Sequence, residues 1–337
     1  MIKTGIIGLG KMGLSHASII NAHPLLELAA VCDTSSFLLE AMRKYGTYAT
    51  FSDYKKMIDE SHLDALFVAT PTKYHAEIVL YALERGIHVF CEKPFSLTFE
   101  QGVKMAGLAE AKKVVNQVGY HNRFLGTFNF LKKLVEKNVI GEIYHFLGEA
   151  YGPVVVKPKE GTWRSVSSEG GGCLFDYSSH VINLLEYVLG EIVDVDGVML
   201  KKVYSKSVED AVYSGLYMKS GLSGLLMVNW SDETYRKMST QITVFGREGK
   251  IISDAQEIKI YLKKENKEFN LEKGWNMKYL TDLTEPVQFN LRGEEYSAQV
   301  DYFARCIDNR TTENRSSFAS ALSTDRILEA MLNKTKK

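Results

Sequence analysis

Through about residue 120, short apolar runs alternate with segments in which apolar residues recur at helical spacing. The runs predict strands at about residues 2–7, 25–31, 47–50, 64–69, 87–91 and 114–119. The segments between them predict helices at about residues 14–20, 37–45, 54–59, 74–85 and 98–112. Strands that alternate with helices of this length indicate a doubly wound parallel sheet. We therefore expect an α/β Rossmann domain over residues 1–121.

The pattern changes near Tyr120. Residues 121–137 have the periodicity of one amphipathic helix, and long apolar segments follow them. These segments predict strands at residues 143–150, 192–204, 211–219, 222–229, 238–245, 251–253 and 258–262, and helices at about 296–308 and 319–333. Short turns between neighbouring strands indicate antiparallel pairing. Residues 122–337 should then form an α+β domain with a large open, mostly antiparallel sheet.

We expect helices to cover one face of this second sheet and a subunit partner to cover the other. A large exposed apolar sheet face is unusual in a monomer. The pattern therefore predicts a homodimer or homotetramer that assembles through the open sheet face.

Composition narrows the possible partners. The chain of 337 residues suffices for two domains, and its 41 basic and 41 acidic side chains balance, which argues against nucleic acid or an anionic membrane as the main partner. No apolar run reaches the roughly 18 residues that span a bilayer, and the first strand begins too early for a signal or transit segment. The four scattered cysteines are typical of reduced thiols, so we expect a cytoplasmic protein.

The first predicted strand ends in a glycine-rich turn, Gly8-Leu9-Gly10-Lys11-Met12-Gly13, and a helix follows. In this pattern Gly8 allows the tight turn, Gly10 lets backbone approach a pyrophosphate, and Gly13 lets the helix pack on the sheet. The helix N-terminus offers N–H groups to the phosphates. Asp33 lies 20 residues beyond Gly13, where its carboxylate can accept the ribose hydroxyls. Together these features predict dinucleotide binding rather than a tight turn without a ligand.

The predicted cofactor is NAD, and NADP is less favoured. Asp33 would meet the extra phosphate of NADP with like charge, and Thr34, Ser35 and Ser36 supply no cation to neutralise it. Their hydroxyls could still bind a phosphate, which leaves NADP open.

Ligands of such sheets bind at the carboxyl ends of the strands. Lys93 follows the fifth strand, and Pro94 favours an extended backbone at the lysine. We expect Lys93 to point at the cleft where a nicotinamide would lie, although most lysines are solvated surface residues. His75 begins the helix after Thr70-Pro71, and it could contact cofactor or substrate, or it could cap the helix or pack against it.

A second candidate group lies at residues 170–180. Asp176 and His180 are four residues apart, so on a helix they share one face, one turn apart. The glycines at 170–172 would let a cofactor or substrate approach the backbone. Taken alone, such a pair is more often a capping acid and a packed histidine.

Together these motifs resemble the Gfo/Idh/MocA oxidoreductase family, which includes glucose–fructose oxidoreductase and inositol dehydrogenase. The resemblance spans almost the whole chain in order, and is carried by residues 8–13, 69–75 (A-T-P-T-K-Y-H), 92–94 (E-K-P), 123–124 (R-F) and 170–180 (G-G-G-C-L-F-D-Y-S-S-H). It implies that Lys93, Asp176 and His180 are the catalytic group and that the late helices pack back toward the first domain. We expect cofactor contacts from Gly8, Leu9, Gly10, Lys11, Met12, Gly13, Asp33, Thr70, Pro71, His75, Glu92 and Lys93.

The chemistry that these residues could perform is hydride transfer from a secondary alcohol to nicotinamide. The cofactor carries the hydride, while the protein orients the reactants and moves the hydroxyl proton. A neutral histidine such as His180 is a natural base near neutral pH. Lys93 would stabilise the developing alkoxide, and Asp176 would hold the substrate or the imidazole. The division between His180 and Lys93 stays open.

Substrate contacts are expected from loops near the helix that carries Asp176 and His180. The main candidates are Asn122, Arg123, Trp163 and Arg164, and weaker ones are Lys157, Lys159, Trp275 and Asn276. If Arg123, Arg164 and Lys157 converge, the substrate is an anionic nucleotide sugar or sugar acid; if they do not, a neutral sugar or inositol fits better. Each arginine could instead form a surface ion pair. No histidine, cysteine and carboxylate set has metal spacing, so no metal is expected.

Three functions compete. The favoured one is an NAD-dependent dehydrogenase acting on a sugar, cyclitol or nucleotide sugar. A non-catalytic sensor of dinucleotide and sugar would not need all three of Lys93, Asp176 and His180. An NAD-using glycoside hydrolase would cleave its substrate without accumulating NADH. Fold alone decides between none of these.

Overall fold

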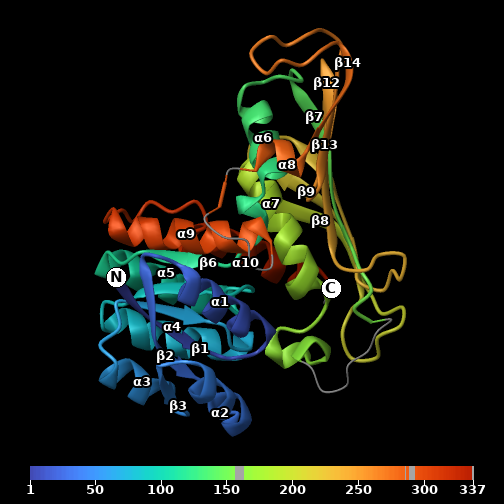
Figure 1. Cartoon of the computed structure of the whole chain (residues 1–337). Coiled ribbons are helices and arrows are strands. Elements are labelled where there is room, and N and C mark those ends of the chain that lie inside the picture. The colour runs from blue at the N-terminus through green and yellow to red at the C-terminus, as the bar shows by residue number, and fades with distance from the viewer. Residues whose placement is uncertain (156–162, 285, 288–292, 336–337) are drawn as a thin grey trace. The chain divides into compact units, whose positions relative to one another are not determined.

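The computed structural model describes residues 1–155, 163–284, 286–287 and 293–335 (Figure 1). The chain forms two compact units, each built on one sheet. Unit 1 comprises Met1–His121 and Pro286–Leu322, and unit 2 comprises Asn122–Glu285 and Ser323–Lys337. Unit 1 thus includes His121, the residue at which the sequence prediction ends the first domain. The assignment of the second domain to substrate binding stays a prediction.

The sheet of unit 1 has six parallel strands in the order β3-β2-β1-β4-β5-β6. The strands are β1 (Ile2–Ile7), β2 (Leu26–Cys32), β3 (Ala49–Phe51), β4 (Ala65–Val68), β5 (His88–Cys91) and β6 (Asn116–Val118). The helices are α1 (Lys11–Ala22), α2 (Ser36–Tyr45), α3 (Tyr54–Glu60), α4 (His75–Glu84), α5 (Phe99–Lys112) and, from late in the chain, α9 (Glu294–Asp308). The predicted doubly wound parallel sheet is confirmed. Its strand order reverses between β1 and β4, where such sheets bind ligands.

Both faces of this sheet are buried, as parallel sheets require. Along β4, Leu66 and Val68 join one apolar cluster, and Phe67 joins the other. The second cluster also holds Phe90 of β5 and Phe303 of α9, whose rings lie 5.9 Å apart. This burial explains why a helix from late in the chain belongs to unit 1.

The sheet of unit 2 has eight strands in the order β14-β13-β12-β11-β7-β10-β9-β8. They are β7 (Ile143–Tyr151), β8 (Ile192–Lys201), β9 (Ala211–Met218), β10 (Ser223–Asn229), β11 (Ser239–Gly246), β12 (Gly249–Asp254), β13 (Glu257–Leu262) and β14 (Gly274–Tyr279). The pairing is antiparallel except between β10 and β7, so the predicted mostly antiparallel sheet is confirmed. The sequence prediction missed β14, whose mixed polar and aromatic residues give little apolar signal.

Helices cover one face of this second sheet (Figure 1). They include α6 (Gly126–Glu136) and α7 (Ser179–Leu189), whose apolar residues share a cluster with the inward strand residues. The last helices are the short α8 (Leu280–Leu283) and α10 (Phe318–Lys334). The strand registers place these exposed residues on the other face: Met199, Tyr217, Leu225, Met227, Tyr261, Trp275, Met277 and Tyr279.

Two predicted elements differ in the structure. The single helix expected over residues 121–137 is instead a 3-10 turn, His121–Phe124, followed by α6. The helical conformation is interrupted at Leu125, which is extended, and Gly126 then lies close to the Leu283 carbonyl. A Cβ added to Gly126 would lie 2.6 Å from that oxygen. The second difference is a π-helical turn, Leu174–Ser178, immediately before α7. Apolar periodicity runs through both sites, so it could not reveal either irregularity.

Candidate functional site

The glycine turn after β1 has the geometry that the motif predicts. Gly8 adopts φ +90°, and a Cβ there would lie 2.7 Å from the Ala69 carbonyl oxygen. A Cβ on Gly13 would lie 1.8 Å from the Gly8 carbonyl oxygen, so α1 packs directly on the turn. Gly10 has no described atom within 4 Å of the corresponding position. The turn is therefore closed on its inner side and open at Gly10, beside the N-terminus of α1.

Asp33 lies directly against this turn. One carboxylate oxygen accepts a hydrogen bond from the Leu9 N–H at 2.6 Å, and the other accepts one from the Ser35 N–H at 2.8 Å. A carboxylate offers about four acceptor positions, so capacity remains for the two hydroxyls of a ribose. Ser35 also caps α2, because its hydroxyl accepts from the Leu38 N–H. The open Gly10 and the adjacent acid fit an NAD molecule, with its pyrophosphate at α1 and its ribose at Asp33.

His75 joins the loops that follow β4 and β5. Its Nε2 lies 2.9 Å from the Thr70 carbonyl oxygen, and its Nδ1 lies 3.0 Å from that of Pro94. Burial lowers the pKa of His75, although the carbonyl contacts oppose this change. The packing alternative for His75 thus has direct support, while its contact with cofactor or substrate stays a prediction.

Glu92 and Lys93 follow β5. The Glu92 side chain is 11% exposed, and its carboxylate lies 2.6 Å from Nε2 of His16 on α1. Burial alone would raise the pKa of Glu92, but the hydrogen bond with His16 and the nearby Lys93 charge lower it overall. The Lys93 N–H donates to Glu92 Oε2 at 3.3 Å, and the Lys93–Pro94 peptide bond is cis. Direct contact of either residue with the cofactor stays a prediction.

The sequence prediction missed His16. This residue is fully buried on α1, together with Gly13, Ala17 and Ile20. A histidine on the apolar stripe of the first helix was the available signal, because a buried polar side chain requires a partner.

In unit 2, Asp176 lies in the π-helical turn and His180 is the second residue of α7. Both residues are buried, at 2% and 3% exposure. They belong to one continuous helical stretch, and π-helical turns often mark functional sites. Asp176 accepts a hydrogen bond from Arg164 Nε at 2.8 Å, which compensates the buried carboxylate. Their joint catalytic role stays a prediction.

The glycine run before this helix packs closely against other parts of the chain. A Cβ on Gly171 would lie 2.6 Å from the Trp163 carbonyl oxygen, and one on Gly172 would lie 2.2 Å from the Glu209 carboxylate. Glu209 accepts a hydrogen bond from the Leu174 N–H, at the start of the helical stretch. Close packing against the chain's own groups therefore accounts for glycine at positions 171 and 172, and the approach of a cofactor or substrate to this backbone stays a prediction.

Arg123 is buried within unit 2. Its Nε donates to Asn183 Oδ1 at 2.6 Å, and its guanidinium carbon lies 5.1 Å from the centre of the Tyr187 ring. Asn183 in turn donates to the Thr324 hydroxyl at 3.0 Å, which also bonds to Glu186. Arg123 thus ties the turn at 121–124 to α7 and, through Asn183, to α10. Arg123 is thus not the surface ion pair weighed from the sequence, and its contact with a substrate stays a prediction.

The remaining substrate candidates are scattered. Asn122 is buried, and its amide nitrogen has no hydrogen-bond partner in the described part of the chain. The Trp163 ring lies 4.6 Å from the Arg164 guanidinium. Trp275 is 60% exposed on β14, and Asn276 bonds the backbone around residue 272. Lys157 and Lys159 lie outside the described residues.

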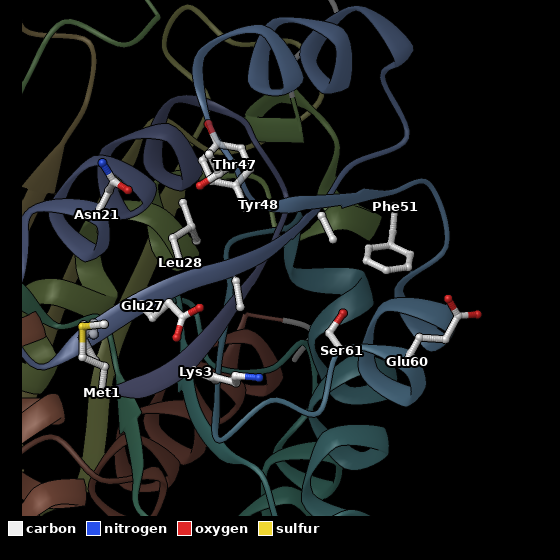
Figure 2. Close-up of a pocket in the computed structure, with 13 residues that line it drawn as sticks. Met1, Lys3, Asn21, Glu27, Leu28, Thr47, Tyr48, Phe51, Glu60 and Ser61 are labelled. Carbon is white, nitrogen blue, oxygen red and sulfur yellow. The ribbon is translucent and has the colours of Figure 1, made fainter.

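Unit 1 has a hollow of about 600 Å³ (Figure 2). Lys3, Glu27 and Ser61 are among its walls, beside the first residues of β1 and β2. Because parallel sheets bind ligands at the carboxyl ends of their strands, this hollow is not the dinucleotide site.

Within residues 1–155, 163–284, 286–287 and 293–335, no cluster of three or more histidine, cysteine or carboxylate side chains could hold a metal ion. The same residues contain no helix long and apolar enough to cross a membrane.

Comparison with known proteins finds two matching family models and several similar chains. The model of the oxidoreductase family with an NAD-binding Rossmann fold matches residues 2–120, and the model of the GFO/IDH/MocA C-terminal domain matches residues 128–252. The chain is 31% identical over 209 residues to a levoglucosan dehydrogenase of Pseudarthrobacter phenanthrenivorans, covering 59% of this chain and 54% of that protein. It is 29% identical over 259 residues to a myo-inositol 2-dehydrogenase of Thermotoga maritima, covering 75% of each. The chain thus spans about half the length of the first relative.

A solved structure of levoglucosan dehydrogenase in complex with NADH and L-sorbose has the same fold, with a TM-score of 0.88 at 23% identity. The alignment covers 100% of this chain and 97% of that one. The two family models and the shared architecture show that the chain belongs to the Gfo/Idh/MocA oxidoreductase family, with an NAD-binding Rossmann fold in its first unit.

Proposed function

We propose that the chain is an NAD-dependent dehydrogenase that acts on a secondary hydroxyl of a sugar, cyclitol or nucleotide sugar. The observation that carries this proposal is the carboxyl edge of the first sheet. There the open glycine turn, Asp33 and Lys93 follow β1, β2 and β5. This edge combines a dinucleotide site with a cation at the strand end where the chemistry of such sheets occurs.

The proposed roles follow from side-chain chemistry. A bound NAD would supply the hydride acceptor. Lys93 would donate a hydrogen bond to the substrate oxygen and stabilise the negative charge that develops on it. His180 would accept the hydroxyl proton, because an imidazole can take up and return a proton near neutral pH. Asp176, compensated by Arg164, would orient the substrate or the imidazole.

Within the proposed substrate class, the arginines favour a neutral polyol. Arg123 is bound to Asn183 and stacked near Tyr187, and Arg164 is bound to Asp176. An anionic substrate would have to compete with these partners for the two guanidinium groups.

NADH absorbance across a panel of inositols, free hexoses, anhydrosugars, sugar acids and nucleotide sugars tests this proposal. Turnover is expected on neutral polyols, and loss of turnover is expected in Lys93→Ala. Lys104→Ala is a matched control, because Lys104 is an exposed lysine that pairs with Glu100 on α5. If NAD binds but every polyol is silent, the sensor or the glycoside hydrolase gains support, and a product assay on glycosides separates these two.

We also propose that a second copy of the chain covers the outward face of the sheet in unit 2. Tyr217, Leu225 and Met227 expose large apolar side chains on the neighbouring strands β9 and β10, and Trp275 exposes another on β14. Leu225→Glu combined with Met227→Glu should shift the chain to a monomer in sedimentation velocity, whereas Glu110→Gln, on α5 of unit 1, should leave assembly unchanged. A wild-type monomer at all concentrations would refute this assembly.

A cytoplasmic location is proposed from the cysteines. All four, at positions 32, 91, 173 and 306, are free and buried. Burial raises the pKa of Cys32 to about 12, and burial raises that of Cys306 as well. Thiols of this kind are inert packing groups and are typical of a reducing compartment.

A further inference from the structure

The helical stretch that carries Asp176 and His180 has no cap from its own first residue. The stretch begins at Cys173, and among the described residues the Cys173 side chain accepts no capping hydrogen bond. The first N–H groups of a helix have no acceptor within it, so other groups must bind them. Cys173 and Leu174 are fully buried, and buried N–H groups require a partner.

Glu209 binds both of these N–H groups from a distant part of the chain. Its backbone carbonyl accepts the Cys173 N–H at 3.0 Å, and its carboxylate oxygen Oε1 accepts the Leu174 N–H at 2.9 Å. Leu174 and Glu209 lie 35 positions apart in the sequence. A Cβ on Gly172 would overlap the same carboxylate, so the glycine makes room for it. One residue thus anchors the start of the stretch, just before Asp176.

The segment that carries Glu209, residues 202–210 between β8 and β9, is itself held in place. Asp210 is fully buried, and its carboxylate accepts the N–H groups of residues 203, 204 and 205 at 2.6, 2.7 and 2.9 Å. A segment whose backbone is bound in this way presents Glu209 in a defined position.

The same segment also contacts the residue beside the ion-pair partner of Asp176. The Ser207 hydroxyl donates to the Ser165 carbonyl at 2.8 Å, and Ser165 directly follows Arg164. Arg164 donates to Asp176 through its side chain at 2.8 Å, and its carbonyl accepts the Gly172 N–H at 3.1 Å. Both members of the Arg164–Asp176 pair are therefore close in sequence to residues that segment 202–210 binds.

We propose that Glu209 is a positioning residue for Asp176. By accepting the Leu174 N–H it fixes the first turn of the helical stretch, and with it the direction of the Asp176 carboxylate. A displacement of about 1 Å at a reacting centre can reduce turnover by about 100-fold. The importance of Glu209 for turnover rests on the proposed function, whereas the capping itself does not.

Two substitutions of similar shape test the capping. Glu209→Met removes the acceptor oxygen, whereas Glu209→Gln keeps one. The readout is hydrogen exchange at the Leu174 amide, resolved by fragmentation mass spectrometry on the whole chain without substrate. Loss of a buried hydrogen bond shifts a local opening equilibrium by about tenfold, so Leu174 should exchange about tenfold faster in Glu209→Met and within about twofold of wild type in Glu209→Gln. Glu142→Ala is the control, because Glu142 is an exposed glutamate of unit 2 that pairs with Arg247.

Turnover tests the positioning role. On a polyol that the wild type oxidises, kcat should fall by about 10-fold to 100-fold in Glu209→Met, and Glu209→Gln should recover most of it. The affinity for NAD should stay unchanged in both variants, because the glycine turn belongs to unit 1. A purely structural defect would not be relieved by restoring one acceptor oxygen.

Two results would overturn the capping: wild-type exchange at Leu174 in Glu209→Met, or exchange in Glu209→Gln as fast as in Glu209→Met. Faster exchange with unchanged kcat would overturn the positioning role. If the Glu209→Met chain does not fold, Glu209→Ala replaces it with the same expectations. A wild-type chain that oxidises no polyol would count against the dehydrogenase proposal instead, and the exchange experiment would still decide whether Glu209 caps the stretch.

Discussion

Gly13→Ala should lower both the free energy of unfolding and the affinity for NAD, whereas Gly10→Ala should lower the affinity alone. A Cβ on Gly13 would lie 1.8 Å from the Gly8 carbonyl oxygen, whereas real Cβ atoms do not approach closer than 3.0 Å. The backbone of α1 or of the turn must therefore move by about 1.2 Å, the difference between these distances. Overpacking of this kind costs about 1 to 3 kcal/mol of unfolding free energy. A displacement of this size in the turn should also weaken NAD binding, because the N–H groups that face the pyrophosphate would move with it.

Gly10→Ala should behave differently. Its φ is −64°, which alanine adopts freely, and no described atom lies within 4 Å of the new Cβ. The free energy of unfolding should change by no more than about 0.5 kcal/mol. The methyl group would nevertheless project where a pyrophosphate approaches the backbone, so NAD affinity should fall by at least about tenfold, or about 1.4 kcal/mol.

Urea unfolding without ligand and calorimetric titration with NAD measure the two effects. Gly107→Ala is the control, because Gly107 lies inside α5 and no atom of the described residues lies within 4 Å of a Cβ there. It should stabilise the chain by up to about 1 kcal/mol and leave NAD binding unchanged. Wild-type NAD affinity in Gly10→Ala would refute the placement of the pyrophosphate at this turn. Wild-type stability in Gly13→Ala would refute the packing argument.

Two further predictions concern unit 2. Arg164→Ala should lower the free energy of unfolding by about 1 to 2 kcal/mol. This is less than the loss for a fully buried ion pair, because the Arg164 side chain is 43% exposed. Arg164→Ala should also reduce turnover more than Arg164→Lys does. Burial raises the pKa of Glu186 above its ordinary 4.5. The folded chain therefore holds the Glu186 proton more tightly than the unfolded chain does. The stability that this gives is fully present below pH 4.5 and is lost as the pH rises through the raised pKa. Urea titrations should therefore show less loss of stability above pH 4.5 in Glu186→Gln than in wild type, and parallel curves would contradict this reading.

The architecture of both units could be predicted because each strand is apolar over its buried residues. The parallel strand β4 is buried at every residue, and inward residues alternate with outward ones along β10. These patterns are local, so they survive in the sequence. Strand β14 carries only partly buried or exposed residues, and its presence depends on pairing with β13. No local pattern predicts such a strand.

The candidate site was predicted less completely. Spacing predicted the turn at Gly8 and its link to Asp33, because the motif itself encodes the geometry. Spacing could not show that Gly171 and Gly172 pack closely against distant parts of the chain, or that Arg123 binds Asn183. Those contacts join residues distant in sequence, and only the folded chain brings them together.

The central claim is hydride transfer from a sugar hydroxyl to NAD, and isotope transfer tests it most directly. A polyol that supports turnover is supplied with deuterium on the carbon that is oxidised, and NADH and sugar products are analysed by mass spectrometry. We predict one deuterium in each NADH formed, an equal amount of keto-sugar, and neither product with Lys93→Ala. Sugar product without NADH, or NADH without deuterium, would contradict the account.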